Sequence, residues 1–74
     1  MNAEVFLDYI ERCNWDVDLV SELLGIESFN LRYWLEGYVE PNKAILQRVA
    51  EWIGNKLQID NEEVFKQITG GNNE

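Results

Sequence analysis

Two glycines twelve residues apart, Gly25 and Gly37, most constrain how this chain can fold. Each follows a short segment whose apolar residues recur at helical spacing, and glycine adopts the left-handed conformation at a helix end at little cost. We therefore expect two short helices, at about Val17–Leu24 and Ser28–Glu36, joined by a tight turn that begins at Gly25. Asp16 has the right chemistry and position to cap the first of them.

Three further helices are expected around this pair. The first spans about residues 2–13, where apolar side chains recur at helical spacing. The fourth begins after Asn42, and Gly54 is expected to break it. A last short helix begins at Asp60, which together with Glu63 has the Asp-x-x-Glu spacing of a capping box.

The fold class is therefore expected to be all-α, a compact bundle of about five short helices. The 74 residues suffice for one small domain, placed at 1–69, with a flexible tail at 70–74. Hydrophobic residues make up 46% of the chain, which is too apolar for a disordered protein. No apolar stretch approaches the roughly 20 residues of a membrane span, and no secretory signal is visible, so we expect a cytoplasmic protein.

The residue types give no support for catalysis. The chain has no histidine, and its one cysteine, Cys13, falls on the apolar side of the first helix, as an inert buried thiol would. Gly70-Gly71 lies in the tail and forms no phosphate-binding loop. We therefore expect no enzymatic activity, no cofactor and no metal site.

A set of small and apolar residues in residues 15–54 carries a family resemblance. The set consists of an apolar-small pair, two glycines, a proline and an apolar-alanine pair: Val20-Ser21, Gly25, Gly37, Pro41 and Val49-Ala50. In this arrangement the stretch resembles the Cro/CI-type (XRE, lambda-repressor-like) helix-turn-helix family of phage and bacterial repressors. The resemblance implies a lambda-repressor-like DNA-binding domain whose helix-turn-helix is formed by the second and third helices. In that family the third helix lies in the major groove.

The resemblance also implies which residues face a partner. By register, the positions that would face bases are Ser28, Phe29, Arg32 and Tyr33. The positions that would face phosphates are Val17, Glu27, Glu36, Tyr38, Val39, Glu40, Asn42 and Lys43.

The charges at and beside these positions are wrong for phosphate. The acids Asp16, Asp18, Glu27, Glu36 and Glu40 outnumber the bases Arg32 and Lys43, and the whole chain has a formal net charge of −8. DNA affinity comes largely from Lys and Arg that displace counterions, so this face is poorly suited to a duplex. Aromatic side chains within an acidic rim instead suit a protein interface.

Two functions follow from this mismatch. In the first, the chain is a small transcription-regulatory protein that binds another protein, in the manner of an antirepressor whose acidic and aromatic face covers a repressor's basic surface. In the second, it is a sequence-specific DNA-binding regulator of the XRE family, acting as a dimer. The family alone places either function in a phage or another mobile element.

Four apolar residues fall at positions that the family leaves polar or outward. Leu19 and Leu23 lie four residues apart and indicate a second interface, a homodimer seam or a cover for the first helix. Leu35 falls at such a position in the third helix. Trp52 lies on the outer side of the fourth helix, where it either contacts a partner or packs on the last helix.

Overall fold

The computed structural model describes residues 1–70 and is helical throughout, without a strand in that range. Its helices are α1 Ala3–Arg12, α2 Val17–Leu24, α3 Ser28–Leu35, α4 Lys43–Leu57 and α5 Asn61–Thr69. The expected all-α bundle of five short helices is therefore confirmed. Of the expected tail, Gly70 ends α5, and residues 71–74 lie outside the described residues.

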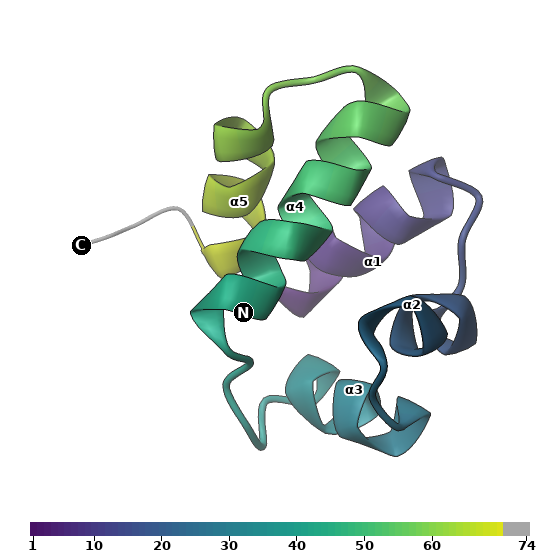
Figure 1. Ribbon diagram of the computed structural model, residues 1–74. Helices are drawn as coiled ribbons and strands as arrows, with labels where there is room; N and C mark the ends of the chain where they lie inside the picture. The colour runs from purple at the N-terminus through teal and green to yellow at the C-terminus, as the bar shows by residue number, and fades with distance from the viewer. Residues whose placement is uncertain (71–74) are drawn as a thin grey trace.

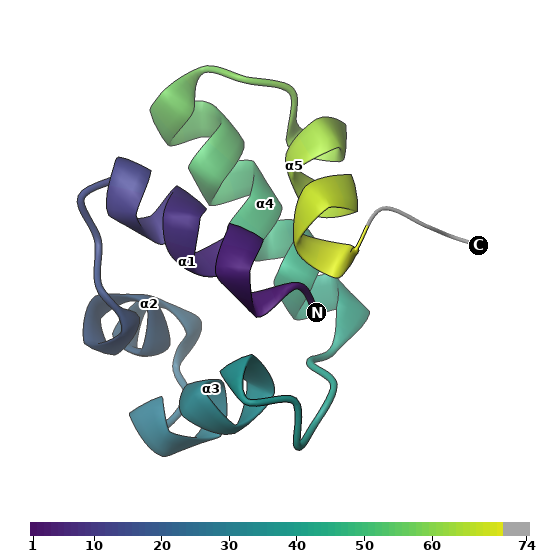
Figure 2. The ribbon, with the colours of Figure 1, turned by 180° about the vertical axis from the view of Figure 1, so that it is seen from behind.

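The helices form two groups along the molecule (Figures 1 and 2). At one end α4 and α5 lie side by side and antiparallel, and α1 packs against both of them. At the other end α2 and α3 form a pair. The start of the chain is fixed to the first group, because the Asn2 amide donates to the Ile68 carbonyl at 2.7 Å.

The core lies mainly among α1, α4 and α5. Its largest fully buried side chains are Phe6, Leu31, Ile53, Ile68, Val20, Val49, Val64 and Cys13. Fully burying an apolar side chain of this size stabilises a fold by about 1.5–3 kcal/mol. Val20 and Leu31 are the fully buried apolar residues of α2 and α3, and half-buried side chains of the same helices, such as Leu24, Trp34 and Leu35, also pack against the core.

Side-chain caps explain where four of the helices begin. Asn2 accepts from the Val5 amide, Asp16 from Leu19, Asn42 from Ala44 and Asp60 from Glu62, at 2.7–3.3 Å. Each such cap typically contributes about 1 kcal/mol. At the other end of α2, Gly25 takes the left-handed conformation with φ 74°, as expected from the sequence.

The expected break at Gly54 is wrong. Helix α4 continues through this glycine to Leu57, and Gln58 ends it in the left-handed conformation with φ 59°. Gly54 is buried where the chain returns toward α5: a Cβ here would collide with the Asn61 side chain and lie 2.9 Å from the Ile59 carbonyl oxygen. The glycine thus permits close packing of α4 against the start of α5.

The structure also differs from two smaller expectations, the end of α3 and the cap of α5. The third helix ends at Leu35, one residue earlier than expected, with Glu36 as its C-cap. Asp60 caps α5 by accepting from the Glu62 amide, and the Glu63 carboxylate accepts a hydrogen bond from Gln67 Nε2 at 2.7 Å instead of one from the Asp60 amide. That i,i+4 pair lies on the helix surface and replaces the reciprocal contact expected from the sequence.

Candidate functional site

Exposed apolar side chains are concentrated around α2 and α3. Eight large hydrophobic residues are exposed in residues 1–70, and six of them lie between Leu19 and Val39: Leu19, Leu23, Phe29, Tyr33, Tyr38 and Val39. A small domain gains nothing in stability from leaving aromatic rings in water, and contiguous apolar patches commonly mark interaction sites. This part of the surface is therefore the candidate site.

Three aromatic rings, Phe29, Tyr33 and Tyr38, form a continuous row on this surface. The Phe29 and Tyr33 ring centroids are 6.1 Å apart at 81°, and those of Tyr33 and Tyr38 are 5.9 Å apart at 89°. Both pairs are edge-to-face, a geometry worth about 0.5–1.5 kcal/mol per pair. We call these three residues the aromatic row.

Local backbone structure places the row. Phe29 and Tyr33 are four residues apart in α3 and so share one side of the helix. Gly37 then takes φ 86°, and the Tyr38 amide donates to the Tyr33 carbonyl at 3.0 Å, which turns Tyr38 back toward Tyr33. The rings nonetheless stay 55%, 46% and 75% exposed, so they are ordered by one another while remaining open to a partner.

Arg32, the basic residue of this surface, forms an ion pair with an acidic residue of α2. Arg32 lies between the ring-bearing positions of α3, and its Nη2 is 3.4 Å from Asp18 Oδ1 on α2. Both side chains are more than half exposed, so the pair contributes little to stability. It does place a carboxylate beside the arginine of this surface.

A glutamate lies at each end of α3, the helix that carries two rings of the aromatic row. Glu27 is the N-cap residue, yet its side chain makes no capping hydrogen bond, so its carboxylate is not used by the helix end. Glu36 is the C-cap and is exposed. We call the surface formed by the aromatic row, Asp18, Glu27, Arg32 and Glu36 the α2–α3 face. Ser28, half-buried at the start of α3, lies at its edge.

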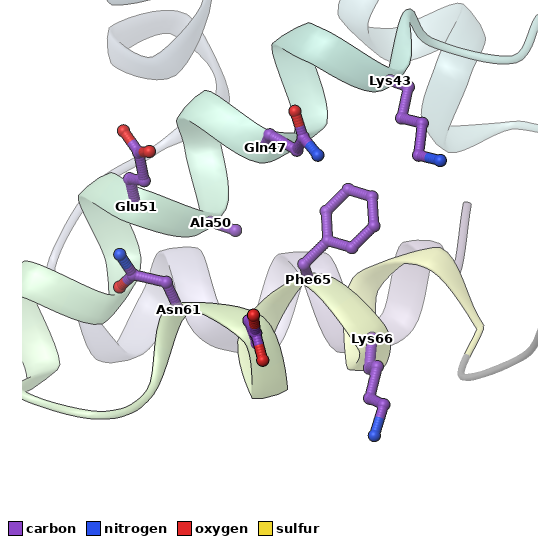
Figure 3. Close-up of a pocket in the computed structure, with 8 residues that line it drawn as sticks. Lys43, Gln47, Ala50, Glu51, Asn61, Phe65 and Lys66 are labelled. Atoms are coloured by element: carbon purple, nitrogen blue, oxygen red, sulfur yellow. The ribbon is translucent and has the colours of Figure 1, made fainter.

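Two residues expected at this site have other neighbours. Glu40 is exposed, and its Oε1 lies 3.3 Å from the amino group of Met1. Lys43 lines the groove between α4 and α5, beside Phe65 (Figure 3). The structure therefore brings Phe29, Arg32 and Tyr33 together with Tyr38, while the Lys43 side chain contributes to a different surface.

The four other apolar residues singled out in the sequence lie in two different environments. Leu19 and Leu23 are 38% and 49% exposed, so they do not form a buried cover for α1 and remain available as a second interface. Leu35 is half-buried and packs against the core, which contradicts its expected outward position. Trp52 is also half-buried and packs against the core.

The one cysteine of the chain, Cys13, is buried and lies outside this site. Burial raises the pKa of the Cys13 thiol, because removing water disfavours the thiolate. In residues 1–70 no three His, Cys, Asp or Glu side chains gather as metal ligands would. Within the same residues, every helix is too short or too polar to cross a membrane.

No protein-family model matches this chain, and neither a curated protein nor a solved structure matches it. Sequence reasoning located the exposed rings, but it missed the Asp18–Arg32 pair and the contact between Tyr33 and Tyr38. The only available signal for the pair was opposite charge on adjacent helices.

Proposed function

We propose that this chain is a small transcription-regulatory protein with a helix-turn-helix formed by α2 and α3, and that it acts by binding another protein through the α2–α3 face. The observation that carries the proposal is the exposed aromatic row, set among carboxylates, with its one arginine already paired to Asp18. Aromatic residues are the commonest anchors of protein interfaces.

The charge of the face argues against a nucleic-acid duplex as its partner. Asp18, Glu27 and Glu36 bring three carboxylates against the single guanidinium of Arg32. A DNA-binding face gains affinity by releasing counterions from phosphates, which requires unpaired Lys and Arg. A basic protein surface would instead be attracted to these carboxylates, and the rings could then anchor it.

The regulatory part of the proposal rests on the family resemblance. The expected register is compatible with α2 at Val17–Leu24, a turn starting at Gly25 and α3 at Ser28–Leu35. In this proposal the partner is a transcriptional repressor, and the chain covers its basic DNA-reading surface. Association would be fast and salt-sensitive, because opposite charges steer the encounter.

Photo-cross-linking in the native cells tests the proposal. A photoreactive phenylalanine analogue replaces Phe29, Tyr33 or Tyr38 in separate variants, and it replaces Ile59, another exposed apolar residue in the α4–α5 connection, in a control. We expect a discrete covalent adduct with a DNA-binding protein at Phe29 and none at Ile59. The absence of any protein adduct at all three positions of the aromatic row would contradict the proposal.

A second candidate function is sequence-specific DNA binding by a dimer. It is favoured by Leu19 and Leu23, which are exposed four residues apart in α2 and could form a dimer seam. Ser28, Arg32 and Tyr33 would then read bases. Selection from a pool of randomised duplexes at low salt tests this function, since an enriched common motif would support it over the first proposal.

A further inference from the structure

A second acidic and apolar surface lies on the outer side of α1, away from the aromatic row. It is a groove of about 520 Å³ with an apolar floor formed by Leu7, Ile10, Trp15 and Val17. Its remaining lining residues are all acids: Glu4, Asp8, Glu11 and Asp16. We call this surface the α1 groove.

The sequence of α1 and the turn after it create the groove. Glu4, Leu7, Asp8 and Glu11 follow the i, i+3, i+4, i+7 spacing that places them on one side of α1. Asn14 then takes φ 66°, and the Trp15 amide donates to the Ile10 carbonyl at 2.9 Å. This turn brings Trp15 and Val17 back beside α1 and so forms the other wall.

The apolar floor of the groove is only partly covered by the protein itself. Leu7 is 43% exposed, and Trp15 and Val17 are half-buried. A leucine and a tryptophan side by side at an open surface can enclose one large apolar side chain from outside. Binding there would remove apolar area from water at about 25 cal/mol per Å².

The rim of the groove carries negative charge that its neighbours neutralise only in part. Asp8 lies 4.0 Å from Arg12, whose guanidinium is also 5.2 Å from the Tyr9 ring centroid. Asp16 is occupied as the cap of α2. Glu4 and Glu11 are exposed and have no ion-pair partner within residues 1–70.

A comparison with the groove between α4 and α5 shows that the excess of acidic lining residues is specific to the α1 groove. It has a similar volume, about 650 Å³, and also contains an aromatic side chain, Phe65. Its charged lining residues balance, with Lys43 and Lys66 against Glu51 and Glu62 (Figure 3). The α1 groove has no lysine or arginine in its lining.

We propose that the α1 groove binds a cationic amphipathic segment of a partner protein. A large apolar side chain of that segment lies between Leu7, Trp15 and Val17, and its Lys or Arg residues lie against Glu4, Asp8 and Glu11. A second copy of this chain is a poor occupant, because each copy has a net charge of −8 and would bring acids to acids. This inference does not depend on the α2–α3 face.

A peptide titration followed by amide NMR tests the inference. The probe is a short synthetic peptide of leucine and lysine at helical spacing, and the control peptide has glutamate in place of every lysine. We expect saturable shifts of the Leu7, Glu11 and Trp15 signals with the cationic peptide and none with the anionic one. No saturable binding, or shifts confined to the aromatic row, would overturn the proposal.

Matched charge reversals distinguish the groove from general attraction to an acidic protein. Glu11→Lys and Glu51→Lys change the net charge equally, and both sites are exposed within helices. We expect about tenfold weaker peptide binding for Glu11→Lys, equivalent to about 1.4 kcal/mol, and little change for Glu51→Lys. Equal weakening by both would overturn the proposal.

Further controls separate this inference from the function proposed above and from self-association. Phe29→Ala should leave the peptide-induced shifts of the Leu7, Glu11 and Trp15 signals unchanged, because Phe29 lies outside the α1 groove. Concentration-dependent shifts of the Leu7 and Trp15 signals without peptide would show that a second copy fills the groove, and would overturn the proposal.

Discussion

The two ends of this small molecule use their apolar residues in opposite ways. Of the twelve buried hydrophobic residues in 1–70, ten belong to α1, its C-cap Cys13, α4 and α5, and two, Val20 and Leu31, belong to α2 and α3. Of the eight exposed large hydrophobics in the same range, six lie in α2, α3 and the loop after them.

This difference indicates a division of roles. The α1–α4–α5 group supplies most of the burial that makes the fold stable. The α2–α3 pair is fixed by few buried side chains and leaves its rings exposed, as expected for a surface that gains its burial from a partner. Substitutions should therefore affect stability at one end and binding at the other.

The largest expected effect on stability is at Phe6. Its side chain is 1% exposed in the core of the α1–α4–α5 group, so Phe6→Ala leaves a cavity. We expect a loss of about 4 kcal/mol of unfolding free energy, measured by urea denaturation followed by circular dichroism. A loss below about 1 kcal/mol would contradict the placement of the core.

Replacing a glycine by alanine at either end of the molecule should destabilise the fold, but by a different amount and for a different reason. Gly54→Ala should cost about 2 kcal/mol, because the new methyl group collides with Asn61 and the Ile59 carbonyl. Gly25→Ala meets no atom within 4 Å and should cost about 1 kcal/mol, from the left-handed backbone alone. Thermal denaturation of both variants measures the difference, and the reverse order would refute the packing role of Gly54.

A substitution at Phe29 should weaken partner binding much more than it lowers stability. Phe29→Ala should weaken partner binding by about 2 kcal/mol, as loss of an interface anchor does. The same change should cost less than about 1 kcal/mol of stability, because the ring is 55% exposed. Calorimetric titration with the partner protein identified by cross-linking measures the loss of affinity, and urea denaturation measures the loss of stability. An equal, large loss of both would show that the ring is part of the core.

The smallest expected effect on stability is at the ion pair between α2 and α3. Asp18→Asn removes one member of an exposed pair and should change the unfolding free energy by about 0.5 kcal/mol or less. It also frees Arg32, so the affinity for a basic partner should fall while stability stays nearly constant. A stability loss above about 2 kcal/mol would show that the pair holds the two helices together.

Local chemistry in the sequence was enough to locate the helix starts. Asn2, Asp16, Asn42 and Asp60 each cap a helix, because a short polar side chain can satisfy an amide of the first turn. Gly54 was misread as a break, since its role comes from Asn61 and Ile59 packing against it. That contact depends on tertiary structure, which a local glycine signal does not contain.

The candidate site was predictable in part. The register that the family resemblance implies places Phe29 and Tyr33 outward, and both rings are exposed. The pairing of Arg32 with Asp18 depends on how α2 lies beside α3, and the place of Tyr38 depends on the turn at Gly37. The α1 groove was not predicted, because its walls come from a helix and from the segment that returns beside it.

A mobility-shift assay on a DNA duplex at low salt tests the central claim most directly. The claim is that the α2–α3 face is built for a protein and repels phosphate. The account predicts no retardation by the native chain at micromolar concentration. It predicts weak retardation by Glu27→Lys/Glu36→Lys, which adds two unpaired bases to the face, but none by the control Glu51→Lys/Glu62→Lys, which carries the same charge change outside the face. Tight, salt-sensitive retardation by the native chain would contradict it.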